Sequence, residues 1–147
     1  EPNAARREAI AALGARVIDP VNEDLPAAIA EMTGGEGVAV AVDAAGVQSA
    51  FDSAIESLAP GGRLSLVAMH EKPVQINAAN VMLFQTEIVG SIGYDPRDFD
   101  EIIEAMSRGV YSAEGWVQDR EIDEVVDAIH ELHEGIGSKV LIRIGGN

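Results

Sequence analysis

Apolar residues along this chain follow two alternating spacings, one typical of helices and one typical of strands. A spacing of three or four residues predicts helices over residues 4–13, 25–32, 47–58, 78–84, 99–107 and 122–132. Short runs rich in alanine, valine and isoleucine predict strands over residues 15–19, 37–42, 63–69, 87–92 and 139–144. Asn3 and Asp24 are suitable N-caps for the first two helices, and a further cap is expected near Asp123.

The predicted strands are continuous apolar runs that do not alternate with polar residues. Residues 37–42, with the sequence GVAVAV, indicate a strand buried on both faces. Strands and helices alternate throughout the first 92 residues, which is typical of βαβ units that form a parallel sheet with helices on both faces. Pro60, Gly61 and Gly62 break the chain before a strand, and Gly145 with Gly146 forms a tail. The predicted fold class is α/β, a doubly wound parallel sheet in one domain over residues 1–147.

Composition and charge restrict the possible partners and sites. The chain has 25 acidic and 10 basic residues, and the resulting net charge of −15 argues against nucleic acid as a partner. The only lysines are Lys72 and Lys139; this fits a salt-loving source, although an ordinary solvated acidic surface is the simpler interpretation. No cysteine is present, which excludes disulfides and thiolate metal sites. Because the chain has neither an apolar run of about 18 residues nor a leading signal peptide, we expect no membrane span and a cytoplasmic location.

The predicted fold directs attention to the carboxyl ends of the strands, where ligands bind in parallel α/β sheets. Three of these ends are rich in small residues: residues 43–46, 68–70 and 90–93. Small side chains let a flat ligand approach the backbone, whose N–H and C=O groups can bond a planar amide. The same residues also suit ordinary turns between a strand and a helix, so both interpretations stay open.

Few titratable residues lie at these ends. We interpret Asp43 as a cap for the following helix, and His70 as part of a solvated turn rather than as a proton relay. His130 and His133 have a spacing that could hold a metal, but no further ligand is evident, so no metal-binding residue is predicted. No catalytic residue is assigned. The glycine clusters at residues 34–37 and 135–137 do not connect a strand to a helix, so they are interpreted as turns and not as a phosphate loop.

Five segments carry a family resemblance through their order and spacing. They are residues 1–20 (EPNAARREAIAALGARVIDP), 38–46 (VAVAVDAAG), 58–70 (LAPGGRLSLVAMH), 87–109 (EIVGSIGYDPRDFDEIIEAMSRG) and 137–144 (GSKVLIRI). The chain resembles the zinc-type medium-chain alcohol dehydrogenases, in the branch of the 2,3-butanediol, sorbitol and threonine dehydrogenases. The resemblance implies a partial Rossmann fold that binds NAD, in an enzyme that transfers a hydride from a secondary alcohol to this cofactor.

The resemblance also implies roles for individual residues. Glu1 matches the acidic residue that bonds the adenosine ribose and favours NAD over NADP, and Arg6 matches a position beside the adenine. Lys139 matches a basic residue near the pyrophosphate. The remaining positions line the cofactor or bond the nicotinamide carboxamide through the backbone: Ala44, Ala45, Val67, Ala68, Met69, Ser91, Ile92 and Gly93.

Several parts of the family pattern have no counterpart in this sequence. The zinc ligands belong to an N-terminal catalytic domain that is missing here, as are the first Rossmann strand with its glycine fingerprint and most of the second. We therefore expect a truncated gene or a proteolysed product that is inactive by itself. The loss would leave a gap in the sheet before residues 37–42, which a partner chain could complete or cap, and we expect a homodimer through a sheet edge.

Two other interpretations remain open from the residues. The segment LAPGGRLSLV, residues 58–67, resembles the turn before a strand in S-adenosylmethionine-dependent methyltransferases, and Glu1 could supply their acidic residue. A non-catalytic module that dimerises or senses a nucleotide is the second alternative.

Overall fold

The computed structural model describes residues 1–145 and divides them into two units. One unit consists of Pro20–Gly93, and the other combines Glu1–Asp19 with the chain from Tyr94 onward. Gly146, half of the expected tail, lies outside the described residues. Within residues 1–145, no helix combines the length and apolar character needed to cross a membrane.

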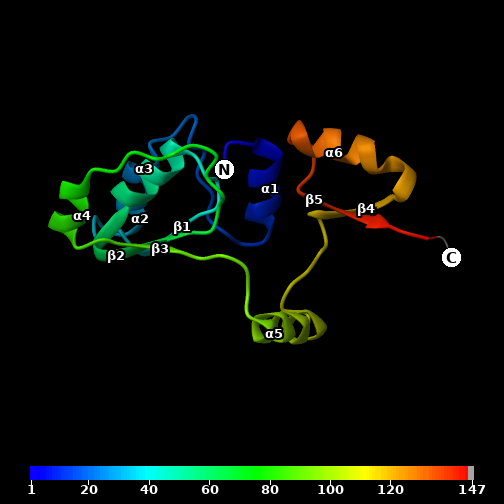
Figure 1. The fold of residues 1–147 in the computed structure, drawn as a ribbon. Coiled ribbons are helices and arrows are strands. Elements are labelled where there is room, and N and C mark those ends of the chain that lie inside the picture. Colours follow the sequence, from blue (N-terminus) through cyan, green and yellow to red (C-terminus); the bar gives the residue numbers. More distant parts are fainter. Residues whose placement is uncertain (146–147) are drawn as a thin grey trace. The chain divides into compact units, whose positions relative to one another are not determined.

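The unit Pro20–Gly93 is built on a three-stranded parallel sheet (Figure 1). Its strands β1, β2 and β3 lie in that order, and helix α3 packs on β1 and β2 while α2 packs on α3. This arrangement confirms the predicted parallel α/β class. The elements in chain order are α2 (Leu25–Met32), β1 (Val38–Asp43), α3 (Gln48–Glu56), β2 (Leu58–Leu66), α4 (Ala78–Phe84) and β3 (Glu87–Gly90).

The core of this unit lies on one face of the sheet. Leu64 of β2 is fully buried and Phe51 of α3 is only 3% exposed, since α3 covers the face that carries Leu64. Val40 and Val42 lie on the alternate face of β1 and are each 60% exposed. The expectation that residues 37–42 are buried on both faces is therefore wrong. An apolar run makes burial of both faces of a strand favourable. Each face is buried, however, only where another element packs on it.

Strand β2 begins earlier and ends earlier than predicted. It contains Pro60, Gly61 and Gly62, which were expected to precede it, because the pairing with β1 shifts from Val38↔Leu58 to Val40↔Arg63 through a bulge. Gly61 has a φ of 75°, so glycine suits the bulge well. β2 and β3 end at Leu66 and Gly90, so residues 67–69 and 91–93 follow the strands instead of forming their last positions.

The other unit contains a second parallel pair of strands. β4 (Val117–Glu121) pairs with β5 (Lys139–Arg143), and the connection between them runs through the short 3-10 helix η1 (Ile122–Glu124) and α6 (Val125–His133). Helix α6 packs on both strands, so this segment forms a βαβ unit (Figure 1). β4 was not predicted, because its sequence VQDRE contains a single apolar residue.

Two helices of this unit have side-chain caps. Asn3 caps α1 (Ala4–Ala12), since its side chain accepts a hydrogen bond from the backbone N–H of Arg6. α5 (Pro96–Ser107) begins three residues before the predicted start, because Asp95 caps it in a reciprocal pair with Asp98. The hydrogen bond from the side chain of Arg97 lowers the pKa of Asp95, so this cap keeps its charge.

Residues 15–19 do not form the predicted strand. Their backbone has no neighbouring strand within the described residues to complete a ladder of hydrogen bonds. Two contacts hold this segment instead: Arg7 of α1 forms a 2.8 Å ion pair with Asp19, and the amino group of Glu1 donates to the carbonyl of Ile18. Apolar β-branched composition alone therefore does not make a strand.

The one-sided core leads to a test of stability. Replacing Leu64 by alanine should lower the free energy of unfolding of the unit Pro20–Gly93 by about 2–5 kcal/mol, because the change leaves a cavity under α3. The matched control is Val42→Ala on the adjacent strand, where the side chain is exposed and a loss of about 0.5 kcal/mol or less is expected. Urea unfolding followed by circular dichroism measures both; equal losses would contradict a core on one face.

Candidate functional site

The three parallel strands of the unit Pro20–Gly93 end side by side at one edge of the sheet. Asp43, Leu66 and Gly90 are paired in register across β1, β2 and β3. The turns that follow them are also connected, since the N–H of Ser91 donates to the carbonyl of Leu66 at 3.0 Å. The structure therefore brings together the predicted cofactor positions of this unit: Ala44, Ala45, Val67, Ala68, Met69, Ser91, Ile92 and Gly93.

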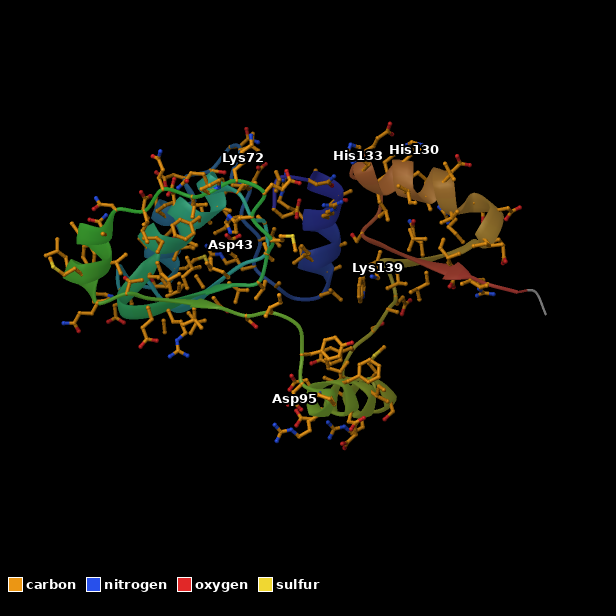
Figure 2. All side chains as sticks on the ribbon, in the orientation of Figure 1. Asp43, Lys72, Asp95, His130, His133 and Lys139 are labelled. Carbon is orange, nitrogen blue, oxygen red and sulfur yellow. The ribbon has the colours of Figure 1, made fainter. Side chains whose placement is uncertain are left out.

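Asp43 organises the first two of these turns (Figure 2). Its side chain is 1% exposed, and its Oδ1 accepts hydrogen bonds from the N–H groups of Ala45 at 2.9 Å and Gly46 at 3.0 Å. Its backbone carbonyl accepts from the N–H groups of Val67 and Ala68, both at 3.1 Å. The N-cap position of α3 belongs to Val47, so the interpretation of Asp43 as a helix cap is wrong. Asp43 instead fixes the turn after β1 and attaches it to the segment after β2.

His70 contacts the same carboxylate. Its Nε2 lies 2.9 Å from Oδ2 of Asp43, and its side chain is 15% exposed. The edge of the ring meets the buried ring of Phe51, with centroids 6.4 Å apart. The two polar atoms are within ion-pair distance, but they are not aligned as a hydrogen bond. His70 is therefore not part of a solvated turn. From the sequence, Asp43 and His70 were interpreted separately. Both residues follow neighbouring parallel strands, and this position could have predicted that they lie close together.

Gly46 brings the first turn into contact with the segment after β2. It has a φ of 69°, and a Cβ atom at this position would lie 2.9 Å from the carbonyl oxygen of Met69 and 3.2 Å from the Cβ of Ala68. Such a separation is too short for a side chain, so only glycine permits this approach. The turn and the segment therefore support one another.

The backbone at this edge can accommodate a planar amide. Within the described residues, the N–H groups of Met69, Ile92 and Gly93 donate no hydrogen bond, whereas those of Val67, Ala68 and Ser91 do. Ala44 and Ala45 are exposed and offer only methyl groups. A flat carboxamide could therefore approach closely and find donors, so the residues of this edge fit the nicotinamide end of a dinucleotide.

Glu1, Arg6 and Lys139 belong to the other unit, which is described by itself. Oε1 of Glu1 accepts a hydrogen bond from the N–H of Asn3, and the side chain remains exposed. Nε of Arg6 donates to the carbonyl of Gly137 at 3.3 Å, beside a cavity of about 150 Å³. Lys139 is the exposed first residue of β5 (Figure 2). Their roles along the cofactor stay predictions.

A zinc ion does not fit the donor sets of the residues that the structure describes. Across residues 1–145, no three histidine, aspartate or glutamate side chains gather closely enough to hold a metal ion. His130 and His133 are exposed on α6 (Figure 2).

A cavity of about 400 Å³ lies elsewhere in the unit Pro20–Gly93. Its lining includes Gly37, Leu58 and Thr86, which adjoin the starts of β1, β2 and β3. It is therefore at the opposite ends of the strands from Asp43, and it does not contribute to the candidate site.

Comparisons with known proteins agree with this geometry. The model of the family described as zinc-binding dehydrogenase matches residues 1–108. The (R,R)-butanediol dehydrogenase of Bacillus subtilis strain 168 is 32% identical over 138 residues, which make up 92% of this chain and 37% of that protein. The 2-dehydro-3-deoxy-L-galactonate 5-dehydrogenase of Pseudoalteromonas atlantica is 32% identical over 109 residues, 74% of this chain and 32% of that protein.

Solved structures are similar over the whole chain. A crystal structure of 2R,3R-butanediol dehydrogenase from Bacillus subtilis matches with a TM-score of 0.89 and 30% sequence identity, over 99% of this chain and 42% of that one. The chain thus spans less than half the length of each protein that it matches here.

The close approach at Gly46 can be tested by a matched pair of variants. Gly46→Ala should lower the free energy of unfolding by about 2–4 kcal/mol, since it adds a clash with Met69 to the cost of a left-handed alanine. Gly61→Ala has the same backbone requirement, with a φ of 75°, but no atom within 4 Å, so only about 1–2 kcal/mol is expected. Urea unfolding measures both values. An equal loss in the two variants would show that the turn does not press against the segment after β2.

Proposed function

Because this chain belongs to the zinc-binding dehydrogenase family, we propose that it is the cofactor-binding portion of an NAD-dependent alcohol or polyol dehydrogenase. The observation that carries this proposal is the set of open backbone donors at the strand ends, on Met69, Ile92 and Gly93. They lie beside small residues at the edge of a parallel sheet, where ligands of such sheets bind.

In this proposal the chain binds and orients the nicotinamide end of NAD. The N–H groups of Met69, Ile92 and Gly93 are the donors available to the carboxamide oxygen, and the methyl groups of Ala44 and Ala45 leave room beside the cofactor. Bound NAD supplies the hydride acceptor of the reaction. The fixed turn after β1 keeps the ring in one orientation, which is the contribution that a protein makes to such chemistry.

The preference for NAD over NADP would come from Glu1. A carboxylate near the adenosine ribose accepts a hydrogen bond from the 2′-hydroxyl and repels a 2′-phosphate. Glu1 is exposed, so a ribose can reach it. Arg6 would lie beside the adenine, and Lys139 near the pyrophosphate.

The substrate of the whole enzyme would be a small secondary alcohol. This class is suggested by the names of the relatives, which include a butanediol dehydrogenase. The zinc ligands would be supplied from outside this chain, since residues 1–145 hold no suitable donor set. We therefore propose that the chain alone does not transfer hydride.

The methyltransferase-like alternative loses its main support. The residues that suggested it, Leu58 to Gly62, form the bulged start of β2, and the family match includes them. A non-catalytic nucleotide-sensing module is not favoured by any particular contact.

Cofactor binding can be measured by titration calorimetry with NADH, NADPH and S-adenosylmethionine. We expect weak binding of NADH, weaker binding of NADPH and none of S-adenosylmethionine. Glu1→Gln should reduce the preference for NADH about fivefold, because it removes a negative charge from the ribose position. Glu8→Gln, an exposed change on α1, is the control and should leave the preference unchanged. Tight binding of S-adenosylmethionine, or no binding of NADH, would overturn the proposal.

We further propose that the chain forms a homodimer through the edge of β3. β1 and β3 are the two outer strands of the sheet, and an unpaired strand edge is a ready site for pairing with another chain. The resemblance implies a dimer through a sheet edge, and β3 is proposed because the family pattern has further strands beside β1.

Sedimentation velocity tests the dimer and the edge that forms it. Val89→Lys on β3 should raise the dimer dissociation constant at least about tenfold, because a lysine on an outer strand disfavours pairing. Val40→Lys on β1 is the matched control, since both valines are exposed on outer strands. A monomeric parent chain, or disruption by Val40→Lys alone, would contradict the proposed interface.

A further inference from the structure

The candidate site contains a buried polar contact between Asp43 and His70. The ring of His70 lies between two groups of the unit Pro20–Gly93: the carboxylate of Asp43, 2.9 Å away, and the ring of Phe51. A carboxylate that is 1% exposed requires compensation, since burying an ionised group without partners is costly. The N–H groups of Ala45 and Gly46 serve Oδ1, and His70 is the group that faces Oδ2.

The same contact determines where the segment after β2 can lie. At its start, the N–H groups of Val67 and Ala68 are bonded to the carbonyl of Asp43. At its end, Nε2 of His70 lies within ion-pair distance of the side chain of the same residue. Met69 lies between the two attachments; its side chain is 89% exposed and its N–H donates no hydrogen bond within the described residues. A short segment held at both ends by one buried residue has little freedom to move.

We propose that His70 is a positioning residue for the cofactor: through Asp43 it holds residues 67–69 so that the N–H of Met69 faces the nicotinamide carboxamide. His70 itself need not touch the cofactor. This inference rests on the proposed function for its ligand, but the attachment of the segment is a property of the chain alone. The proposal gives His70 a role in orienting residues 67–69, whereas the sequence alone suggested a solvated turn.

Three variants separate this role from a general loss of structure. His70→Leu keeps an apolar side chain against Phe51 but removes the polar contact with Asp43. His70→Gln keeps an N–H donor that can reach Oδ2 of Asp43, so it should restore the parent behaviour. His130→Leu removes an exposed histidine from α6 in the other unit and is the control. Asp43→Asn, which keeps an acceptor for Ala45 and Gly46, replaces His70→Leu if that variant does not fold.

The first measurement is amide hydrogen exchange, which needs no cofactor. In His70→Leu the N–H groups of Val67 and Ala68 should exchange about fivefold faster, because the segment opens more easily once its polar contact with Asp43 is lost. The N–H of Ser91, which is bonded to Leu66 instead, should be unchanged. His70→Gln and His130→Leu should match the parent chain.

The second measurement is saturation-transfer NMR with NAD, read separately at the nicotinamide and adenine protons. His70→Leu should lower the ratio of nicotinamide to adenine saturation about threefold or more, and His70→Gln should restore it. A mere loss of stability would weaken both ends together and would leave the ratio unchanged. An unchanged ratio in His70→Leu, an absence of rescue by His70→Gln, or an equal fall in His130→Leu would overturn the positioning role.

The two measurements also separate the two proposals. If the parent chain shows no saturation at any proton of NAD, the proposed function fails. Faster exchange in His70→Leu with rescue by His70→Gln would then still support the attachment of residues 67–69. Unchanged exchange would refute it.

Discussion

The buried carboxylate of Asp43 is the constraint on which the candidate site depends. Removing a charge from water costs several kcal/mol unless fixed partners replace the solvent. In this chain Oδ1 accepts from two N–H groups of the turn after β1, and Oδ2 lies 2.9 Å from Nε2 of His70. The carbonyl of the same residue accepts from two N–H groups of the segment after β2. Satisfying one residue therefore shapes two of the three turns at the sheet edge.

The sheet that carries this edge is covered unevenly, and this affects both stability and association. Leu64 and Phe51 bury the face beneath α3, whereas Val40 and Val42 remain largely exposed on the other face of β1. Exposed apolar strands next to an unpaired edge favour contact with further protein. The family relatives are longer than this chain, which spans 37% of the butanediol dehydrogenase. The exposed face of β1 is therefore a surface on which further protein could pack.

The sequence could predict those features that depend on local pattern. α4 occupies residues 78–84 as expected, and the parallel class followed from the alternation of strands with helices. Features that depend on a neighbour could not be predicted. Residues 15–19 form no strand in the part of the chain that the structure describes, the bulge in β2 requires the register with β1, and β4 is paired despite its polar sequence. The candidate site likewise has one part that the local sequence pattern predicts and one part that depends on packing. Its strand ends followed from topology, whereas the contact between Asp43 and His70 links residues 27 positions apart and depends on how the turns pack.

The net negative charge of the chain affects how it can bind an anionic cofactor, and the proposed backbone donors at the strand ends suit this charge. A chain with a net charge of −15 repels an anionic cofactor at long range, although salt at physiological strength screens this repulsion beyond about 8 Å. In the proposed site this repulsion matters least at the nicotinamide carboxamide, because that group is neutral and backbone N–H groups are uncharged. The pyrophosphate has no such alternative, since it requires a glycine-rich helix start or a cation. In the proposed orientation, Lys139 would supply only one positive charge there. The proposed contribution of this chain to cofactor binding is therefore strongest at the neutral nicotinamide end and weakest at the phosphates.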